Sequence, residues 1–600
     1  MSGYLQPALV SVENLFRNVH MLVPEYQRAY AWEKPEWDDL WADVYEGMRN
    51  SSDHYLGTVV LRKIDEHQVD SRGRTIAVFE IVDGQQRLVT LALLALALYD
   101  PLRGSALGND IWSEFVEDAN VPRLRLGGPN ADYFLELVRA AHAGSALPDS
   151  TRTTNKRIKK CLTTYREKLA ANSGISDAES PEAILKYIRQ RLQILRFITD
   201  DASLAIKTFQ TVNDRGRQIS LLDKTKSLLM FYVTKYLPGD AEVLRCVQEG
   251  FGRVFENFDK TMDLAATNKV EYLTNPRYRF GEGELLTFAY HYSMRHLTNA
   301  CGLSDYAYAY DLGARKVFDS FIKPALLRLR NQRDVLRRFV CGFVDDLATI
   351  AQSLCEIVAQ IPDNRRYQSL FQRQGVSASV YPLLVGLKAS GLLDDRMLDA
   401  VSVLDLRVYQ IRGTDPKAWL YKEAVSKLRS GASYSQIYDA IVSYTHWYGN
   451  DAVLDGYLRQ AVYRKGFVHL ILWEMATAES SEPDASSGKS FSEFQVDHIL
   501  PQKPLIDVTT CGFASEDDYL SRIHRFGNLC LLDDTLNAGA GDRSLAVKID
   551  YYARSSLEAT RILGARLSET GFGLDGIEER TNSIIDFFRS RWPISSSTST

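Results

Sequence analysis

The sequence lacks the features that mark a secreted, disulfide-stabilised or membrane-spanning protein. Its seven cysteines are scattered along 600 residues without a C-x-x-C pair. Neither a disulfide framework nor a cysteine-rich zinc site is therefore expected, and a reducing cytoplasm fits best. The longest apolar run, near Leu88–Leu98, is much shorter than a membrane helix. No basic stretch followed by an apolar segment begins the chain. We expect a soluble, cytoplasmic protein without a membrane partner.

The chain also has no excess of basic residues. It carries 71 Lys and Arg against 76 Asp and Glu, a formal net charge of −5. Any binding of nucleic acid must therefore come from local patches. Hydrophobic residues make up 45% and charged residues 24%, which excludes a mostly disordered or collagen-like chain. The length predicts two to four domains.

The apolar patterns predict an α+β multidomain protein. Near the N-terminus, Tyr55–Arg62 and Ile76–Val82 are short and β-branched like strands, whereas the Leu/Ala-rich Leu88–Tyr99 favours a buried helix. Farther along, apolar residues recur every three or four positions, which predicts helices. The clearest of these are Asn155–Leu169, Ala325–Phe343 and Val344–Ile361. Two further short strands are predicted at Phe494–Leu500 and Gly527–Leu532, ahead of another helix. We expect domains at 1–235, 236–465 and 466–592, and a disordered tail at 593–600.

The most informative motif is V-D-H-I-L-P-Q, followed about 26 residues later by F-G-N-L. Phosphodiester hydrolysis needs a base that deprotonates water and a divalent metal beside the leaving oxygen. Adjacent strand residues point to opposite faces, so Asp497 and His498 diverge and can take these two roles. Asn528 can fix the imidazole, and Asn537 on the following helix can supply a second metal oxygen. The pattern predicts a single-metal nuclease; the alternative is a strand end with a hydrogen-bonded histidine.

This pattern resembles the HNH, or ββα-metal, nuclease motif. The resemblance implies that His498 is the general base and that Asn528 orients it. It also implies that Asp497 and Asn537 bind Mg²⁺ or Mn²⁺, with Lys548 as an auxiliary basic residue near the phosphate. The motif lacks the cysteine pairs of some HNH proteins, so no structural zinc is implied.

A second motif, D-G-Q-Q-R, joins a predicted strand to a predicted helix. Backbone N–H groups at a helix start favour anions, and Arg87 adds a fork suited to phosphate. Asp83 could bind a metal or position water, while Gln85 and Gln86 offer neutral hydrogen bonds after the turn at Gly84. These residues predict a phosphate site; the alternative is a polar turn that caps a helix.

Two more stretches complete a family pattern. They are P-x-Y-Q-R-x-Y-x-W, which begins at Pro24, and F-x-x-x-N-x-x-G, which begins at Phe209. In this order, with D-G-Q-Q-R and the HNH-like end, the motifs resemble the GmrSD family of modification-dependent (type IV) restriction enzymes. Phosphorothioate-sensing SspE-type proteins share this plan. The resemblance covers about 1–235 and 466–592 and implies a ParB-like α+β N-terminal domain with nucleotide-hydrolysing activity. A long, mainly helical middle and a small HNH-like nuclease domain would follow.

The same resemblance implies two sets of binding residues. A nucleoside triphosphate, GTP as the first guess, would be bound by Asp83, Gly84, Gln85, Gln86, Arg87, Asn213, Arg215 and Gly216. A DNA mark would be read by Tyr26, Gln27, Arg28, Tyr30 and Trp32. An aromatic-plus-amide pocket suits a flipped sugar-modified base or a polarisable sulfur. Core packing is the alternative for Tyr30 and Trp32, and a simple turn for the segment around Asn213.

These observations predict an endonuclease of phage defence that cuts chemically modified double-stranded DNA under nucleotide control. A homodimer is compatible with the sequence. One alternative is a nucleotide-dependent DNA-binding sensor whose nuclease site is vestigial. The other is an HNH enzyme that nicks unmodified DNA or RNA, its first domain acting in protein interaction. The complete set of Asp497, His498, Asn528 and Asn537 argues against the vestigial site.

Overall fold

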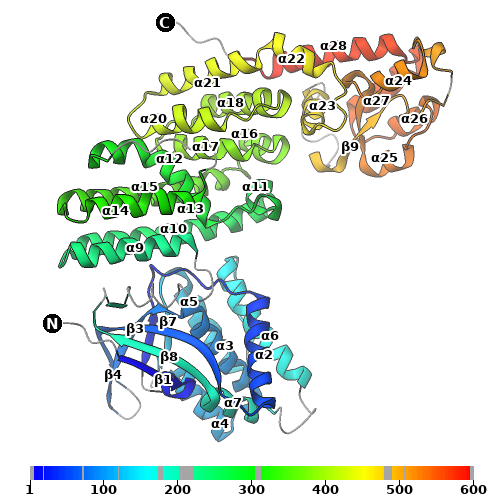
Figure 1. Ribbon diagram of the computed structural model, residues 1–600. Helices are drawn as coiled ribbons and strands as arrows, with labels where there is room; N and C mark the ends of the chain where they lie inside the picture. Colours follow the sequence, from blue (N-terminus) through cyan, green and yellow to red (C-terminus); the bar gives the residue numbers. More distant parts are fainter. Residues whose placement is uncertain are drawn as a thin grey trace.

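The computed structural model describes residues 6–17, 19–69, 73–118, 120–172, 180–201, 204–205, 220–303, 312–478, 490–505 and 507–594. An α+β domain lies at one end of the molecule, a stack of helices follows it, and a smaller α+β domain lies at the far end (Figure 1). The predicted α+β multidomain class is confirmed. Within the described ranges, no helix has both the length and the apolar character needed to cross a membrane.

The N-terminal domain is built on a six-stranded mixed sheet. In spatial order its strands are β1 (Gln6–Ser11), β8 (Leu192–Thr199), β3 (His54–Val69), β4 (Thr75–Asp83), β2 (His20–Val23) and β7 (Leu124–Leu126). β3 pairs antiparallel with β4 and parallel with β8. A separate hairpin joins β5 (Glu117–Asp118) to β6 (Val121–Pro122). Both strands predicted near the N-terminus are confirmed, since they lie within β3 and β4.

Helices cover this sheet and share one core with it. They are α1 (Val12–Phe16), α2 (Lys34–Arg49), α3 (Gln85–Leu102), α4 (Ala106–Ile111), α5 (Ala131–Ala143), α6 (Thr153–Asn172) and α7 (Pro181–Arg191). Helix α3 is buried from Leu88 to Tyr99, which confirms the predicted buried helix. It is apolar on every side because the core surrounds it, with α6 and α7 among its neighbours.

The middle of the chain is a stack of helices with its own core. Its α-helices are α9 (Leu221–Tyr236), α10 (Ala241–Thr267), α11 (Glu271–Thr274), α12 (Glu282–Cys301), α13 (Ala314–Lys316), α14 (Lys323–Leu329), α15 (Arg333–Ala359), α16 (Arg365–Gln368), α17 (Tyr381–Ala389), α18 (Asp395–Leu404), α19 (Lys417–Trp419), α20 (Ser426–Leu428) and α21 (Tyr434–Gly449). The predicted helix boundary at Phe343 is wrong, because α15 continues through it and the break lies before Arg333. Close packing of α10 on α15 keeps this long helix in place: a Cβ at Gly250 would lie 2.1 Å from Val344 Cγ1.

The C-terminal domain surrounds an antiparallel hairpin of β9 (Phe494–His498) and β10 (Leu529–Asp533). Its helices are α22 (Asp451–Leu458), α23 (Gly466–Ala478), α24 (Glu516–Arg522), α25 (Asp534–Ala540), α26 (Leu545–Tyr552), α27 (Glu558–Thr570) and α28 (Leu574–Arg591). Alternation along β10 sends Leu529 and Leu531 into a cluster with α23 and α28. Cys530 and Leu532 face α25 and α26 instead. Both faces of the hairpin are therefore covered.

Candidate functional site

The two motif residues at the end of β9 point to opposite faces of the hairpin. In the register, Asp497 lies opposite Cys530 and His498 opposite Leu529. Asp497 therefore faces α26, whereas His498 faces Tyr463, which precedes α23. Both are buried, at 5% and 3% exposure. The divergence expected from strand alternation is present.

The imidazole of His498 is held by a second histidine. His498 Nε2 lies 2.9 Å from His524 Nδ1, and the Tyr463 ring centroid lies 4.1 Å from that of His498. Burial first, then the charges of His524 and Lys548, lowers the pKa of His498 to about 3. The imidazole is therefore neutral at neutral pH and able to accept a proton, but so low a pKa makes it a weak base in this state.

Sequence reasoning missed His524. The contact spans 26 residues and is made from the irregular segment between α24 and β10. Neither helical nor strand periodicity relates the two histidines, so spacing could not have paired them. A histidine four positions before the Asn of F-G-N-L was the available hint.

Asp497 lies in a buried network rather than at an open metal position. Its Oδ1 accepts a hydrogen bond from Lys548 Nζ at 2.7 Å, and its Oδ2 accepts one from the Tyr552 hydroxyl at 2.6 Å. Burial raises the pKa of the Asp497 carboxyl, and Lys548 opposes this shift. Lys548, at 1% exposure, lies beneath the hairpin. Its ammonium group neutralises Asp497, and the expected place of Lys548 beside the phosphate stays a prediction.

The donors suit Mg²⁺ or Mn²⁺ in type but not in arrangement. Carboxylate and amide oxygens are suitable ligands for these ions. Asn537, on α25, is half-buried, and its side chain makes no hydrogen bond within the described part of the chain. Both oxygens of Asp497 are already engaged, one of them by a cation, so the arrangement does not fit a metal bound through Asp497. Across the described ranges, no three His, Cys, Asp or Glu side chains gather to hold a metal ion.

Asn528 does not contact His498, contrary to the predicted role. Its Oδ1 accepts from the Leu500 N–H at 2.8 Å, and its Nδ2 donates to the carbonyls of Leu500 and Ile523 at 3.1 and 2.8 Å. The amide is fully buried. It thus ties the chain after His498 to the chain before His524, and acts on the two histidines through the backbone.

The D-G-Q-Q-R motif forms a tight turn whose side chains bind neighbouring backbone. Gly84 has φ 93°, and a Cβ there would lie 2.7 Å from a Val59 methyl group, so glycine is required. Arg87 Nη1 donates to the Thr58 carbonyl at 2.8 Å. Gln85 Nε2 donates to the Arg28 carbonyl at 2.9 Å, while Gln86 contacts the backbone of both Ala29 and Ala31.

These contacts join the two N-terminal motifs into one structure. The segment 26–31 lies against the turn at 83–87, and Gln27 Nε2 donates back to the Val82 carbonyl at 3.2 Å. The geometry is therefore that of a polar turn at a helix start, the alternative to a phosphate site. Asp83 makes further contacts of its own. Asn213, Arg215 and Gly216 lie outside the described residues.

The five predicted mark-reading residues do not share one surface. Tyr30, at 4% exposure, is a core residue whose hydroxyl contacts Thr90 at 2.7 Å and accepts from Trp37 Nε1 at 2.8 Å. These bonds and the surrounding core remove the side chain from the surface, which favours the alternative of core packing. Trp32 is half-buried against the same core.

Tyr26 and Arg28 instead contact the helical middle. Lys226 of α9 donates to the Tyr26 carbonyl at 2.7 Å and lies 4.6 Å from the centre of the Tyr26 ring. Arg28 pairs with Glu282 of α12 at 2.9 Å. Tyr26 and Gln27 also line a cavity of about 40 Å³, together with Arg62, Asp223 and Lys226 among others.

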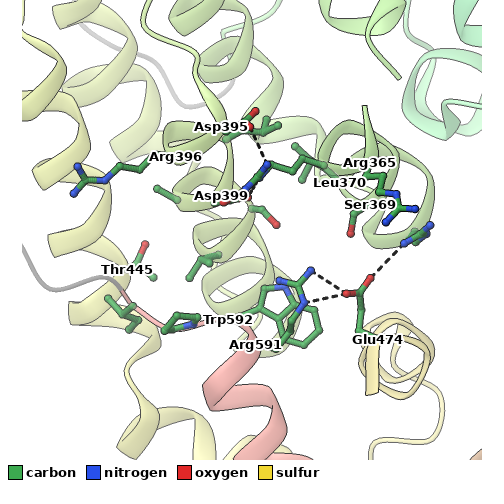
Figure 2. A pocket seen from close by; sticks show the side chains of 18 of the residues that line it. Arg365, Ser369, Leu370, Asp395, Arg396, Asp399, Thr445, Glu474, Arg591 and Trp592 are labelled. Atoms are coloured by element: carbon green, nitrogen blue, oxygen red, sulfur yellow. Dashed lines mark hydrogen bonds and ion pairs between the residues drawn. The ribbon is translucent and has the colours of Figure 1, made fainter. Parts of the chain in front are cut away.

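A larger cavity of about 860 Å³ lies where the helical middle meets the C-terminal domain (Figure 2). Its charged walls are held by ion pairs. Arg366 pairs with Asp395 and Asp399, and Glu474 of α23 pairs with Arg591 at 2.9 Å and with Arg373 at 3.5 Å. The arginines that Glu474 bridges come from different domains, so this carboxylate helps to join them.

The structure thus consists of an α+β domain with a helix-start turn, a helical middle, and a hairpin domain with a buried histidine at a strand end. Residues 12–230 match the family model described as GmrSD restriction endonuclease, N-terminal domain. Residues 448–587 match the model described as GmrSD restriction endonucleases, C-terminal domain. Since the two matches together cover more than half of the sequence, the chain belongs to the GmrSD restriction endonuclease family. No curated protein matches the chain. The family is one of phage-defence endonucleases, so the substrate is DNA.

Proposed function

We propose that this chain is a cytoplasmic endonuclease that cuts chemically modified double-stranded DNA under the control of a nucleoside triphosphate, with His498 as general base. The observation that carries the proposal is the position of His498: at the end of β9, neutral, and fixed by a neighbouring imidazole. It lies inside the segment that matches the GmrSD C-terminal domain.

In this mechanism His498 accepts a proton from the water that attacks the phosphorus. The P–O bond to the leaving strand then breaks, the leaving oxygen takes a proton from solvent water, and the imidazolium of His498 returns its proton to solvent. Asp497, Lys548 and Tyr552 stabilise the hairpin that carries His498 and exclude water from its other face. Dependence on Mg²⁺ or Mn²⁺, which the resemblance to HNH nucleases implies, is part of this proposal, and cleavage with and without EDTA tests it.

The test of the nuclease is plasmid cleavage by folded His498→Ala. We expect a loss of about 10²–10⁴-fold or more, because a general base contributes that much. His446→Ala, an exposed histidine on α21, is the matched control and should cut normally. Undiminished cleavage by His498→Ala would rule out His498 as the general base. Glucosylated, phosphorothioate and unmarked plasmids, each with and without GTP, test the specificity.

Nucleotide control is proposed at the turn 83–87. What supports it is the helix start at Gln85, the guanidinium of Arg87, and the direct contact of this turn with the segment 26–31. Arg87→Ala should lose affinity for GTP or ATP in calorimetric titration. A variant that binds nucleotide normally but melts earlier would assign Arg87 to holding β3 through Thr58. Sedimentation with and without DNA tests whether the protein forms the homodimer with which its sequence is compatible.

A second candidate function has two observations in its favour. The engagement of both Asp497 oxygens and the deep burial of His498 suit a nucleotide-dependent DNA-binding sensor whose nuclease site is vestigial. Nucleotide-dependent binding of marked DNA without any cleavage, at any divalent metal tested, would favour the sensor.

A further inference from the structure

The two histidines of the C-terminal domain make a directed contact. A neutral imidazole has one N–H donor and one acceptor nitrogen, so the bond between His498 Nε2 and His524 Nδ1 needs a proton on one of them. If His498 carries its proton on Nε2, its Nδ1 is left as the basic nitrogen. If His524 Nδ1 donates instead, the basic nitrogen of His498 is consumed by the pair.

The surroundings fix His524 independently of His498. Its backbone carbonyl accepts from the Val462 and Tyr463 N–H groups at 2.9 and 3.3 Å. Its ring stacks on the Tyr463 ring, with centroids 5.7 Å apart and planes 15° apart. The Tyr463 ring also contacts the His498 ring. His524 is thus a rigid partner, and it is the more exposed of the two histidines.

Nδ1 of His498 makes no hydrogen bond within the described part of the chain. This leaves it available for the attacking water. In a catalytic triad, the residue hydrogen-bonded to the histidine likewise holds its imidazole in the tautomer that can act as base.

We propose that His524 is a positioning residue for DNA cleavage: its Nδ1 accepts the Nε2–H of His498 and keeps Nδ1 of His498 free as the base. This inference rests on the proposed function of His498. Asn528 stabilises the positions of both histidines, because its side chain links the backbone beside His498 to the backbone beside His524. His524 itself needs no contact with DNA.

The test compares three replacements of His524 in the full-length protein. Asn places an acceptor oxygen near the position of His524 Nδ1, Gln places it one bond farther out, and Phe keeps a ring without an acceptor. We expect kcat to fall about 10- to 100-fold in His524→Phe and His524→Gln, the size seen when an outer hydrogen-bonding partner is lost. His524→Asn should recover most of the rate, and KM for DNA should change little in all three.

The outcomes separate this inference from the proposed function. Wild-type cleavage by folded His524→Phe, beside an inactive His498→Ala, would overturn the role of His524 and leave the nuclease intact. Cleavage by His498→Ala would overturn the proposed function itself. Equal losses in the Asn, Gln and Phe variants would also overturn the role, since they indicate packing alone.

A spectroscopic measurement on the unaltered protein keeps the proposal falsifiable if a variant fails to fold. Ring ¹⁵N shifts of the selectively ¹⁵N-histidine-labelled full chain, assigned with His498→Ala, report the tautomer of His498. A protonated Nε2 is expected. A protonated Nδ1 would overturn the proposal.

Discussion

Lys548 and Asp497 form an ion pair that is almost entirely removed from water, with side-chain exposures of 1% and 6%. A buried ion pair of this kind adds little to the free energy of unfolding compared with apolar side chains in its place. Removal of one partner, however, leaves an uncompensated buried charge. Only neutral donors, the Tyr552 hydroxyl and the His498 backbone N–H, would then face the Asp497 carboxylate. The stability of the hairpin that carries His498 therefore depends on the Lys548 ammonium group.

Lys548→Met should lower the free energy of unfolding of the C-terminal domain by about 3–5 kcal/mol. Lys427→Met is the matched control, because Lys427 pairs with Glu423 at the surface and should cost less than about 1 kcal/mol. Urea denaturation followed by tryptophan fluorescence measures both. Addition of Asp497→Asn to Lys548→Met should restore part of the loss. A stable Lys548→Met protein would show that another cation balances Asp497.

Tyr30 illustrates a residue whose chemistry suggested recognition but whose environment assigns it to the core. Thr90 donates its hydroxyl proton to the Gln86 carbonyl, so the Tyr30 hydroxyl donates to Thr90 and accepts from Trp37. Tyr30→Phe should cost about 1–3 kcal/mol, because two buried polar groups lose their partner. Melting curves beside exposed Tyr457→Phe measure the cost. Preference for marked DNA should stay unchanged per folded molecule, and a lost preference would return Tyr30 to the reading site.

At the scale of elements, the regular parts followed from the sequence and the irregular contacts did not. The strands β3, β4, β9 and β10 were predictable because short β-branched runs are bounded by turns. The start of α15 was misplaced because apolar periodicity runs through both α14 and α15, while the break lies in the polar segment before Arg333. Periodicity says which face is apolar but not where a helix stops.

The candidate site shows the same limit. Strand alternation correctly separated Asp497 from His498, since it depends on local geometry alone. The partners of both residues depend on tertiary packing: His524 lies 26 positions from His498, and Lys548 lies 51 from Asp497. Motif order predicted a candidate site at these residues, but only the packed structure revealed that Lys548 faces inward.

Helix α12 carries a buried histidine that makes the helical middle sensitive to acid. His291 packs on the Tyr421 ring with centroids 4.1 Å apart, and burial, with Lys417, lowers its pKa to about 3 from 6.5. Between pH 3 and pH 6.5, His291 therefore binds a proton more readily in the unfolded chain than in the folded protein. Stability contributed by neutral His291 is present above about pH 6.5 and is lost as the pH falls toward 3.

His291→Phe should reduce the loss of stability on acidification. The native histidine accounts for about 2 kcal/mol of destabilisation at pH 5 relative to pH 7, from a 1.5-unit interval below its unfolded pKa. Phenylalanine keeps a ring against Tyr421 but takes no proton. Melting temperatures at pH 5, 6 and 7 measure the difference between the two proteins. If the melting temperatures of the wild type and His291→Phe fall by the same amount from pH 7 to pH 5, His291 does not titrate in this range.

At the scale of the whole molecule, two joints hold three domains together. Glu474 links the helical middle to the C-terminal domain by bridging Arg373 and Arg591 beside the large cavity (Figure 2). The other joint lies between the N-terminal domain and the helices, where Lys226 holds Tyr26 and Arg28 pairs with Glu282. The segment 26–31 also contacts Gln85 and Gln86. The turn 83–87 and α12 therefore contact the same short segment.

The ion pair of Arg28 with Glu282 should carry nucleotide control from the first domain to the second. Its carboxylate is mostly buried, and burial raises the pKa of Glu282 to about 7, with Arg28 opposing the shift. Asp223 and Asp259 raise this pKa further, and Ser220 lowers it. The pair is therefore fully charged only above about pH 7, and the charge on Glu282 is lost as the pH falls through that value.

Glu282→Gln should uncouple nucleotide from DNA while it leaves basal cleavage intact, because the amide keeps the shape of Glu282 and removes its charge. The ratio of DNA Kd values with and without GTP should fall toward 1. By linkage, the effect of marked DNA on the Kd of GTP should fall by the same factor. Acidification of the wild type from pH 8 to 6 should act in the same direction.

Asp345→Asn, which removes an exposed ion pair with Arg253 in the same helical middle, is the control and should keep full coupling. Fluorescence titrations of full-length protein in both orders of addition measure both ratios. Unchanged ratios in Glu282→Gln would mean that control reaches the nuclease by a route that does not include α12.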